Sequence, residues 1–123
     1  MNIALWIVQA LLALAFAIAG ITKLVQPRKD LISHMHWVED FSGTAVKVIG
    51  ALEAAAAIGL VLPAATGTAV VLTPLAATGL AITMIGAAVT HLRRNEPSHV
   101  IVNAVLFALA AFVAWGRFGP YSF

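Results

Sequence analysis

The sequence contains no cysteine and carries little charge. Of its 123 residues, 10% are Asp, Glu, Lys or Arg, 62% are hydrophobic, and the mean hydropathy is +0.99. Without cysteine the chain has no disulfide framework, no thiolate nucleophile and no dithiol redox pair. A formal net charge of +2 is too small to argue for binding nucleic acid. Ordinary soluble domains contain about 25% charged residues, so this composition predicts an integral membrane protein in contact with the lipid bilayer.

Four apolar stretches rich in alanine and leucine follow one another along the chain. A helix needs roughly 20 residues to cross about 30 Å of hydrocarbon. None of the stretches has a polar face, which is typical of helices that face lipid. We therefore predict an all-α fold, a four-transmembrane-helix bundle that forms a single domain over residues 1–123. Its spans are expected at about residues 3–23, 45–63, 68–91 and 99–116, with Pro63 ending the second span.

The basic residues indicate how the spans are oriented. They follow the first stretch instead of preceding it, which favours a retained span over a cleaved signal peptide. Most lie in or beside the connections after the first and third stretches: Lys23, Arg28, Lys29, Lys47, Arg93 and Arg94. The positive-inside rule then predicts a multi-pass protein of the cell membrane, with these two connections in the cytoplasm and both termini outside.

The connection between the first two stretches is too long for a simple turn. Its sequence "DLISHMHWVEDFSG" (residues 30–43) mixes apolar residues such as Leu31, Val38 and Phe41 with charged residues and histidines. This mixture predicts a short amphipathic segment that lies along the membrane interface or dips into the mouth of the bundle. A solvated loop is the alternative.

Small residues recur at four-residue spacing on two of the stretches. Ala51, Ala55 and Gly59 form one such ridge, and Gly79, Thr83 and Ala87 form another. Ridges of this kind let transmembrane helices approach closely. They predict a tightly packed bundle with little room for a large cofactor.

A single acid interrupts the second stretch. Glu53 stands in the middle of "KVIGALEAAAAIGLVLP" (residues 47–63), about 9 Å deeper along the helix axis than Lys47. A charge at that depth is costly unless it is paired, protonated or turned toward the bundle interior. Polar residues of the other spans are available as partners: Gln9, Lys23, His91 and Asn103. Lys23 and His91 close their spans, so contact with the deeper Glu53 requires a slightly sunken mouth.

These polar residues form the candidate site. Glu53 and His91 are the candidate catalytic acid–base groups, and Lys23, Asn103 and Gln9 are the candidate ligand-binding residues. Two alternatives remain open for Glu53: a polar lock that only fixes the helices, and a lipid-facing acid that reaches the interface. The sequence predicts no metal site, because His34 and His36 would point apart on a helix and no cysteine or clustered carboxylate completes a set.

Three segments resemble the DoxX-like family of small four-span membrane proteins. They are "AGITKL" (19–24), "VIGALEAAAAIGLVLP" (48–63) and "LAATGLAITMIGAAVTHLRRNE" (75–96). Their most telling parts are the pairs Gly20–Lys23 and Gly50–Glu53 and the run that begins at His91. The resemblance covers nearly the whole chain, implies the four-span fold, and adds Gly50 to the candidate ligand-binding residues.

The resemblance implies less about chemistry than about fold. The family's name derives from a subunit linked to thiosulfate–quinone oxidation, and relatives occur beside oxidoreductases or as assembly factors. It implies an accessory or quinone- or amphiphile-binding component of membrane redox chemistry, with a quinone as candidate cofactor. The candidate partners are an oxidoreductase and a second copy of the chain. One alternative is a stand-alone enzyme with isomerase-type acid–base chemistry on a lipid-like substrate. The other is a non-catalytic assembly protein.

Overall fold

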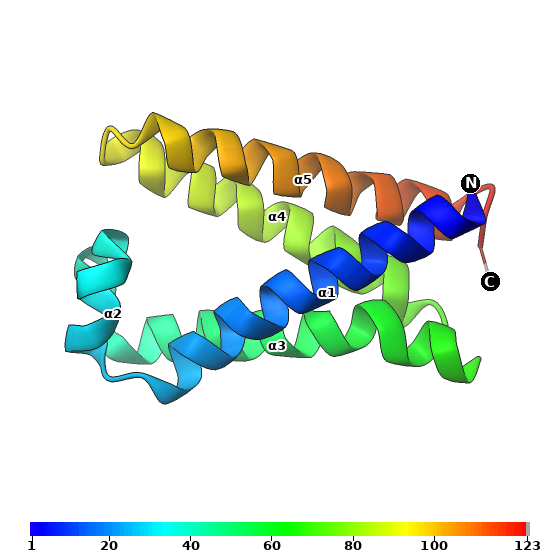
Figure 1. Ribbon diagram of the computed structural model, residues 1–123, viewed down its shortest axis with the longest axis horizontal. Helices are drawn as coiled ribbons and strands as arrows, with labels where there is room; N and C mark the ends of the chain where they lie inside the picture. Colours follow the sequence, from blue (N-terminus) through cyan, green and yellow to red (C-terminus); the bar gives the residue numbers. More distant parts are fainter. Residues whose placement is uncertain (123) are drawn as a thin grey trace.

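The computed structural model describes residues 1–122, without the side chains of His34 and Asp40, and is all-α. Four long helices are joined in chain order, with a short helix and a 3-10 turn after the first (Figure 1). Their bounds are α1 (Asn2–Val25), α2 (Arg28–His34), η1 (His36–Asp40), α3 (Gly43–Thr66), α4 (Leu72–Arg93) and α5 (Pro97–Phe118). The four long helices are long and apolar enough to cross a membrane. The chain is therefore a multi-pass membrane protein, and the predicted fold class is confirmed.

The long helices pack mainly as two pairs, α1 against α3 and α4 against α5. The α3–α4 hairpin and the contact of α1 with α5 join the pairs. We call the end of the bundle that carries both chain termini the terminal end, and the opposite end the α2 end (Figure 1). The pairs lie close together at the terminal end and spread apart toward the α2 end (Figure 1).

Helix α3 runs through its proline instead of ending there. Ser42 caps its start by accepting a hydrogen bond from the backbone N–H of Ala45 at 3.1 Å, and Gly67 ends it in a left-handed conformation. The prediction that Pro63 ends the second span is therefore wrong. A proline leaves the carbonyl four residues earlier without its helical donor. The hydroxyl of Thr73, on α4, donates to that carbonyl of Gly59 at 2.9 Å, which replaces the missing bond.

Helices α1 and α3 touch backbone to backbone at two glycines. A Cβ added to Gly20 would lie 2.6 Å from the carbonyl oxygen of Gly50 and 2.7 Å from the backbone nitrogen of Ala54. The predicted ridge is wrong at Ala51 and Ala55, which are exposed while Gly50 is buried. Its third member, Gly59, does lie close to another helix, α4. The close approach of α1 and α3 matters for the site, since it brings the side chains one turn away within reach of each other.

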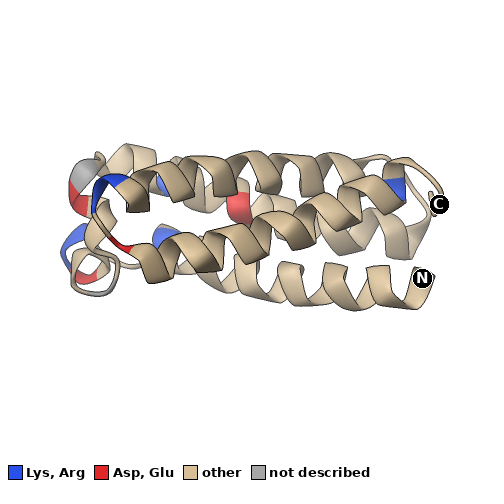
Figure 2. Cartoon of the chain, turned by 90° about the horizontal axis from the view of Figure 1, so that it is seen from above, with Lys and Arg blue, Asp and Glu red and all other residues tan. Residues whose placement is uncertain are grey.

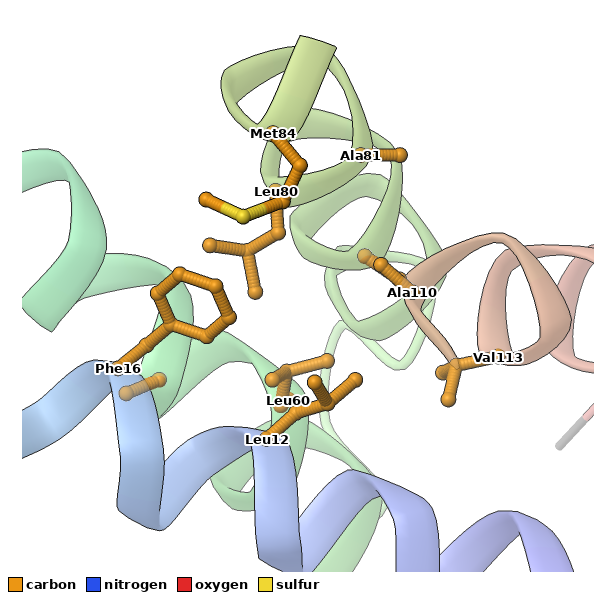
Figure 3. Close-up of a cluster of buried hydrophobic side chains, with 10 residues drawn as sticks. Leu12, Phe16, Leu60, Leu80, Ala81, Met84, Ala110 and Val113 are labelled. Carbon is orange, nitrogen blue, oxygen red and sulfur yellow. The ribbon is translucent and has the colours of Figure 1, made fainter. Parts of the chain in front are cut away.

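An apolar core fills the middle of the bundle. It receives side chains from all four long helices, chiefly Leu12, Phe16, Leu60, Leu80, Met84, Ala110 and Val113 (Figure 3). This core joins the two helix pairs. Phe16 and Met84 also form part of the wall of the cavity described below.

The connection between α1 and α3 folds against the α2 end of the bundle. Leu31, Val38 and Val46 are buried together, and Trp37 and Phe41 pack beside them. The guanidinium of Arg28 donates to the backbone carbonyls of Val38, Glu39 and Phe41 at 3.5, 3.4 and 3.2 Å, respectively. The predicted amphipathic segment is thus confirmed, and a solvated loop is ruled out.

Candidate functional site

A buried ion pair joins α1 to α3. Nζ of Lys23 donates to Oε1 of Glu53 at 2.6 Å, and the two residues are 6% and 4% exposed, respectively. Each lies one helical turn beyond a glycine of the backbone contact, Lys23 after Gly20 and Glu53 after Gly50. Gly50 is therefore not part of the cavity wall, and instead packs against Cβ of Lys23. Pairing makes the buried charges tolerable, because a single uncompensated charge in this position would be strongly destabilising.

A cavity of about 420 Å³ lies between the two helix pairs. Its wall is mostly apolar and comes from all four long helices together with Trp37 and Phe41. The polar residues that line it are Lys23, Glu53, Thr83, Thr90, His91 and Asn103. The structure thus brings together four of the residues singled out in the sequence: Lys23, Glu53, His91 and Asn103. The expected tight packing is found at the glycine contacts and in the apolar core, but not between the helix pairs, where this cavity lies.

Asn103 offers the cavity a buried polar group. It is 8% exposed, and its side-chain amide nitrogen has no hydrogen-bond partner among the residues that the structure describes. A buried amide without a partner costs about 1–3 kcal/mol. The nitrogen itself has almost no accessible surface, so an acceptor atom in the cavity reaches it only if the Asn103 side chain rotates.

Two aromatic residues complete the cavity at the α2 end. Trp37 and Phe41 meet edge to face, with ring centroids 5.5 Å apart and an interplanar angle of 81°. Nζ of Lys23 lies 5.6 Å from the centroid of the Trp37 ring, within the range of a cation–π contact. Neither aromatic residue was a candidate from the sequence. The available signal was the presence of both in a segment that was expected to dip into the bundle mouth.

His91 connects the cavity to the turn between α4 and α5. Its Nδ1 lies 2.8 Å from Oε1 of Glu96, and its ring stacks on that of His99 with centroids 4.7 Å apart. A carboxylate only accepts hydrogen bonds, so Nδ1 of His91 carries the hydrogen. This bond holds the pKa of Glu96 below its usual value of 4.5, helped by the charges of His91, Arg94 and His99 and opposed by partial burial.

This contact predicts a pH-dependent contribution to stability. Because the folded state lowers the pKa of Glu96, its stabilisation is present above pH 4.5 and is lost as the pH falls through the lowered pKa. We expect Glu96→Gln to lower the melting temperature slightly at pH 7 and to have less effect as the pH approaches 3. In a His91→Gln background the pH dependence should largely disappear. An effect of Glu96→Gln that grows on acidification contradicts the assignment.

Comparison with known proteins gives the family. The sequence matches the DoxX-like family over residues 7–113. The chain belongs to the DoxX-like family. No curated protein and no solved structure matches it. The matched range contains Lys23, Glu53, His91 and Asn103, so the cavity of this DoxX-like protein lies in the part of the chain that defines the family.

Gln9 lies at the terminal end of this DoxX-like protein and does not line the cavity. Its amide donates to the carbonyl of Leu60 at 2.6 Å and accepts from Nε of Arg117 at 2.7 Å. Arg117 is 3% exposed and also donates to Oδ1 of Asn2 at 2.6 Å and to the carbonyl of Tyr121 at 2.9 Å. This network ties the two ends of the chain together. The sequence gives no sign of this network, because Arg117 lies 108 residues from Gln9.

In the described part of the DoxX-like chain, no three His, Cys, Asp or Glu residues come together in a way that could hold a metal ion. The side chain of His34, which was weighed as a metal ligand, lies outside the described residues. His36 is exposed and does not line the cavity. The groups that the site offers to a ligand are therefore a buried ion pair, an amide, an imidazole and aromatic surface.

Proposed function

We propose that this DoxX-like protein binds the head group of a quinone, or of an amphipathic carbonyl compound of similar size, as an accessory component of membrane redox chemistry. The observation that carries the proposal is the buried Asn103 amide without a partner, in the wall of a mostly apolar cavity beside the Lys23–Glu53 pair. A volume of about 420 Å³ falls within the roughly 300–1,000 Å³ that is usual for small-molecule sites.

The cavity wall matches the chemistry of a quinone head. The carbonyl oxygens of a quinone accept hydrogen bonds but donate none. Two residues that carry donor groups line the cavity, Asn103 on α5 and Lys23 on α1. Phe16, Met84 and Trp37 supply apolar and aromatic surface for the faces of the ring. In a site of low dielectric, such donors bind an acceptor more strongly than they would in water.

The same residues suit proton transfer to a bound quinone. Reduction to the quinol takes two electrons and two protons. In this proposal an oxidoreductase partner supplies the electrons, since the chain has no thiol to oxidise. Glu53 or His91 would transfer the two protons one after the other, and Lys23 would offset the charge that remains. The hydrogen bond from His91 to Glu96 offers a connection for protons to the surface of the α4–α5 turn.

We also propose the orientation that the charges favour. Most of the charged residues gather at the α2 end (Figure 2). The exposed basic residues in this group are Arg28, Lys29, Lys47 and Arg93. By the positive-inside rule, the α2 end faces the cytoplasm and both termini face the outside of the cell membrane.

Quenching of Trp37 fluorescence tests the proposal. Trp6 and Trp115 are replaced by phenylalanine, so that Trp37 in the cavity wall is the single reporter, and decylubiquinone is titrated into proteoliposomes. We expect saturable quenching. Asn103→Leu should weaken the apparent affinity about tenfold, because one hydrogen bond to a buried donor is lost.

Thr78→Val is the matched control, since Thr78 lies on α4 outside the cavity wall and, in the part of the chain that the structure describes, its hydroxyl donates to the carbonyl of Pro74 on the same helix. It should bind the quinone like the parent protein. Quenching that never saturates, or that is the same in Asn103→Leu, contradicts the proposal. Either result would favour a non-catalytic assembly protein, in which the Lys23–Glu53 pair only holds the helices together. Turnover of a lipid-like substrate by the purified protein alone would instead favour the isomerase alternative.

A further inference from the structure

The contact between α3 and α4 is confined to the terminal end. There a Cβ added to Gly59 would lie 3.0 Å from Cβ of Ala76, and Thr73 donates to the Gly59 carbonyl. Toward the α2 end the two helices diverge (Figure 1). Thr83, Ala87 and Thr90 follow Ala76 by seven, eleven and fourteen residues, so they lie on the same face of α4. They line the cavity.

The edge of that face is open to the outside. Gly86 lines the cavity and is nevertheless exposed, and a Cβ added to it would meet nothing within 4 Å. Thr83 and Thr90 beside it are only partly buried, and on α3 the partly buried Ile49 also lines the cavity. We call the gap bounded by Thr83, Gly86 and Thr90 on α4 and by Ile49 on α3 the window.

The window lies at the depth of the hydrocarbon. Gly86 precedes the end of α4 at Arg93 by seven residues, or about 10 Å along the helix, and Thr83 lies about 15 Å from that end. The hydrocarbon core of a bilayer is about 30 Å thick. At the α2 end, in contrast, Trp37 and Phe41 contribute to the cavity wall, and Val38 between them is fully buried. The cavity is therefore open toward lipid and lined by packed aromatic side chains toward water.

We infer that the ligand reaches the cavity sideways from the bilayer through the window, and that it is a lipid-dissolved molecule with a compact polar head and a hydrocarbon chain. The head lies beside Asn103 and the Lys23–Glu53 pair, and the chain passes between Thr83 and Ile49 into the bilayer. The identity of the head rests on the proposed function, whereas the window does not. The buried Asn103 amide without a partner, in the same cavity, is independent support for an occupant with a polar head.

Photolabelling from the bilayer tests the window without a quinone. The probe is a long-chain alcohol with a diazirine beside its hydroxyl group, dissolved in proteoliposomes, and mass spectrometry locates the labelled residues. Carboxylates capture alkyl diazirines efficiently, so Glu53 reports a head group in the cavity. Gly86→Phe should reduce labelling of Glu53 about tenfold, because forcing a chain past an added side chain carries an overpacking cost. A helical side chain leans toward the N-terminus, so Phe at position 86 covers the Thr83 side of the window.

Gly79→Phe is the matched control. Gly79 lies two turns from Gly86 on the same side of α4, is exposed, has open space around an added Cβ, and does not line the cavity. It should leave labelling of Glu53 unchanged. Absence of label at Glu53 in the wild type overturns the inference, and so does equal labelling of the two variants. If Gly86→Phe blocks labelling of Glu53 but decylubiquinone does not quench Trp37 in a saturable way, entry through the window is supported. Only the identification of the ligand as a quinone is then rejected.

Discussion

Replacing Lys23 with methionine is expected to lower the free energy of unfolding by about 3–5 kcal/mol, the usual cost of breaking a buried ion pair on one side. Methionine fills much of the lysine volume, so the loss reflects the charge and not a cavity. Glu53 would remain almost completely buried without its hydrogen-bond donor at 2.6 Å. The free energies of unfolding of the wild type and the variant are compared in mixed detergent micelles, with unfolding monitored by circular dichroism.

Two variants make this result specific. Replacing Glu53 with leucine in addition to Lys23→Met removes both charges and should restore most of the lost stability. Lys47→Met is the control at an exposed lysine, which donates to the carbonyl of Leu24 at 2.9 Å. It should cost about 1 kcal/mol or less. If Lys23→Met is no more destabilising than Lys47→Met, the ion pair does not hold α1 to α3.

Replacing Gly20 with alanine should destabilise the bundle by about 3 kcal/mol, at the upper end of overpacking costs. The new Cβ would lie 2.6 and 2.7 Å from backbone atoms of Gly50 and Ala54, which cannot move away by changing a rotamer. Helices α1 and α3 would have to separate, and this would also draw Lys23 away from Glu53. The better helix propensity of alanine offsets less than about 1 kcal/mol of the loss.

Gly79→Ala provides the comparison for this prediction. An added Cβ at Gly79 meets nothing within 4 Å, so the same chemical change should be neutral or stabilising by up to about 1 kcal/mol. The melting temperatures of the two variants, measured in the same detergent, decide the question. Equal melting temperatures would show that α1 and α3 do not depend on backbone contact at Gly20.

The fold could be predicted because composition decides it in a membrane protein. Long stretches with few charges leave helices as the simplest way to satisfy the backbone in lipid. The same reasoning named Lys23 as one of several possible partners for Glu53, and the structure pairs the two. The difference in depth between them is overcome because two glycines bring the helix backbones together one turn away.

Features that depend on helix rotation could not be predicted in this way. A helix that is apolar on every face gives no signal for which face meets its neighbour. Ala51 and Ala55 were therefore expected on a packed ridge, whereas Gly50 and Ala54 are the residues that meet α1. The hydrogen-bond partners of Gln9 could not be predicted for the same reason. Its partner Arg117 lies 108 residues away, and only the folded bundle brings their side chains together. The cavity likewise results from the divergence of two helix pairs, which no local pattern encodes.

The continuation of α3 past Pro63 also depends on a contact between helices. The carbonyl of Gly59 is satisfied by a hydroxyl from α4, and the sequence of α3 alone contains no sign of this donor. In lipid such a replacement is needed, because no water is present to bond the freed carbonyl. The residue that allows α3 to continue past Pro63 is therefore Thr73, on the next helix.

Native mass spectrometry tests the central claim, that the cavity holds an amphipathic molecule taken from the membrane. The wild type and Asn103→Leu are each solubilised from their own membranes in mild detergent, and the masses of bound small molecules are measured. We predict an adduct with the mass of a quinone on the wild type and its loss from Asn103→Leu, with similar melting temperatures for both. A folded wild-type protein that carries no adduct, even after incubation with decylubiquinone, would contradict the account.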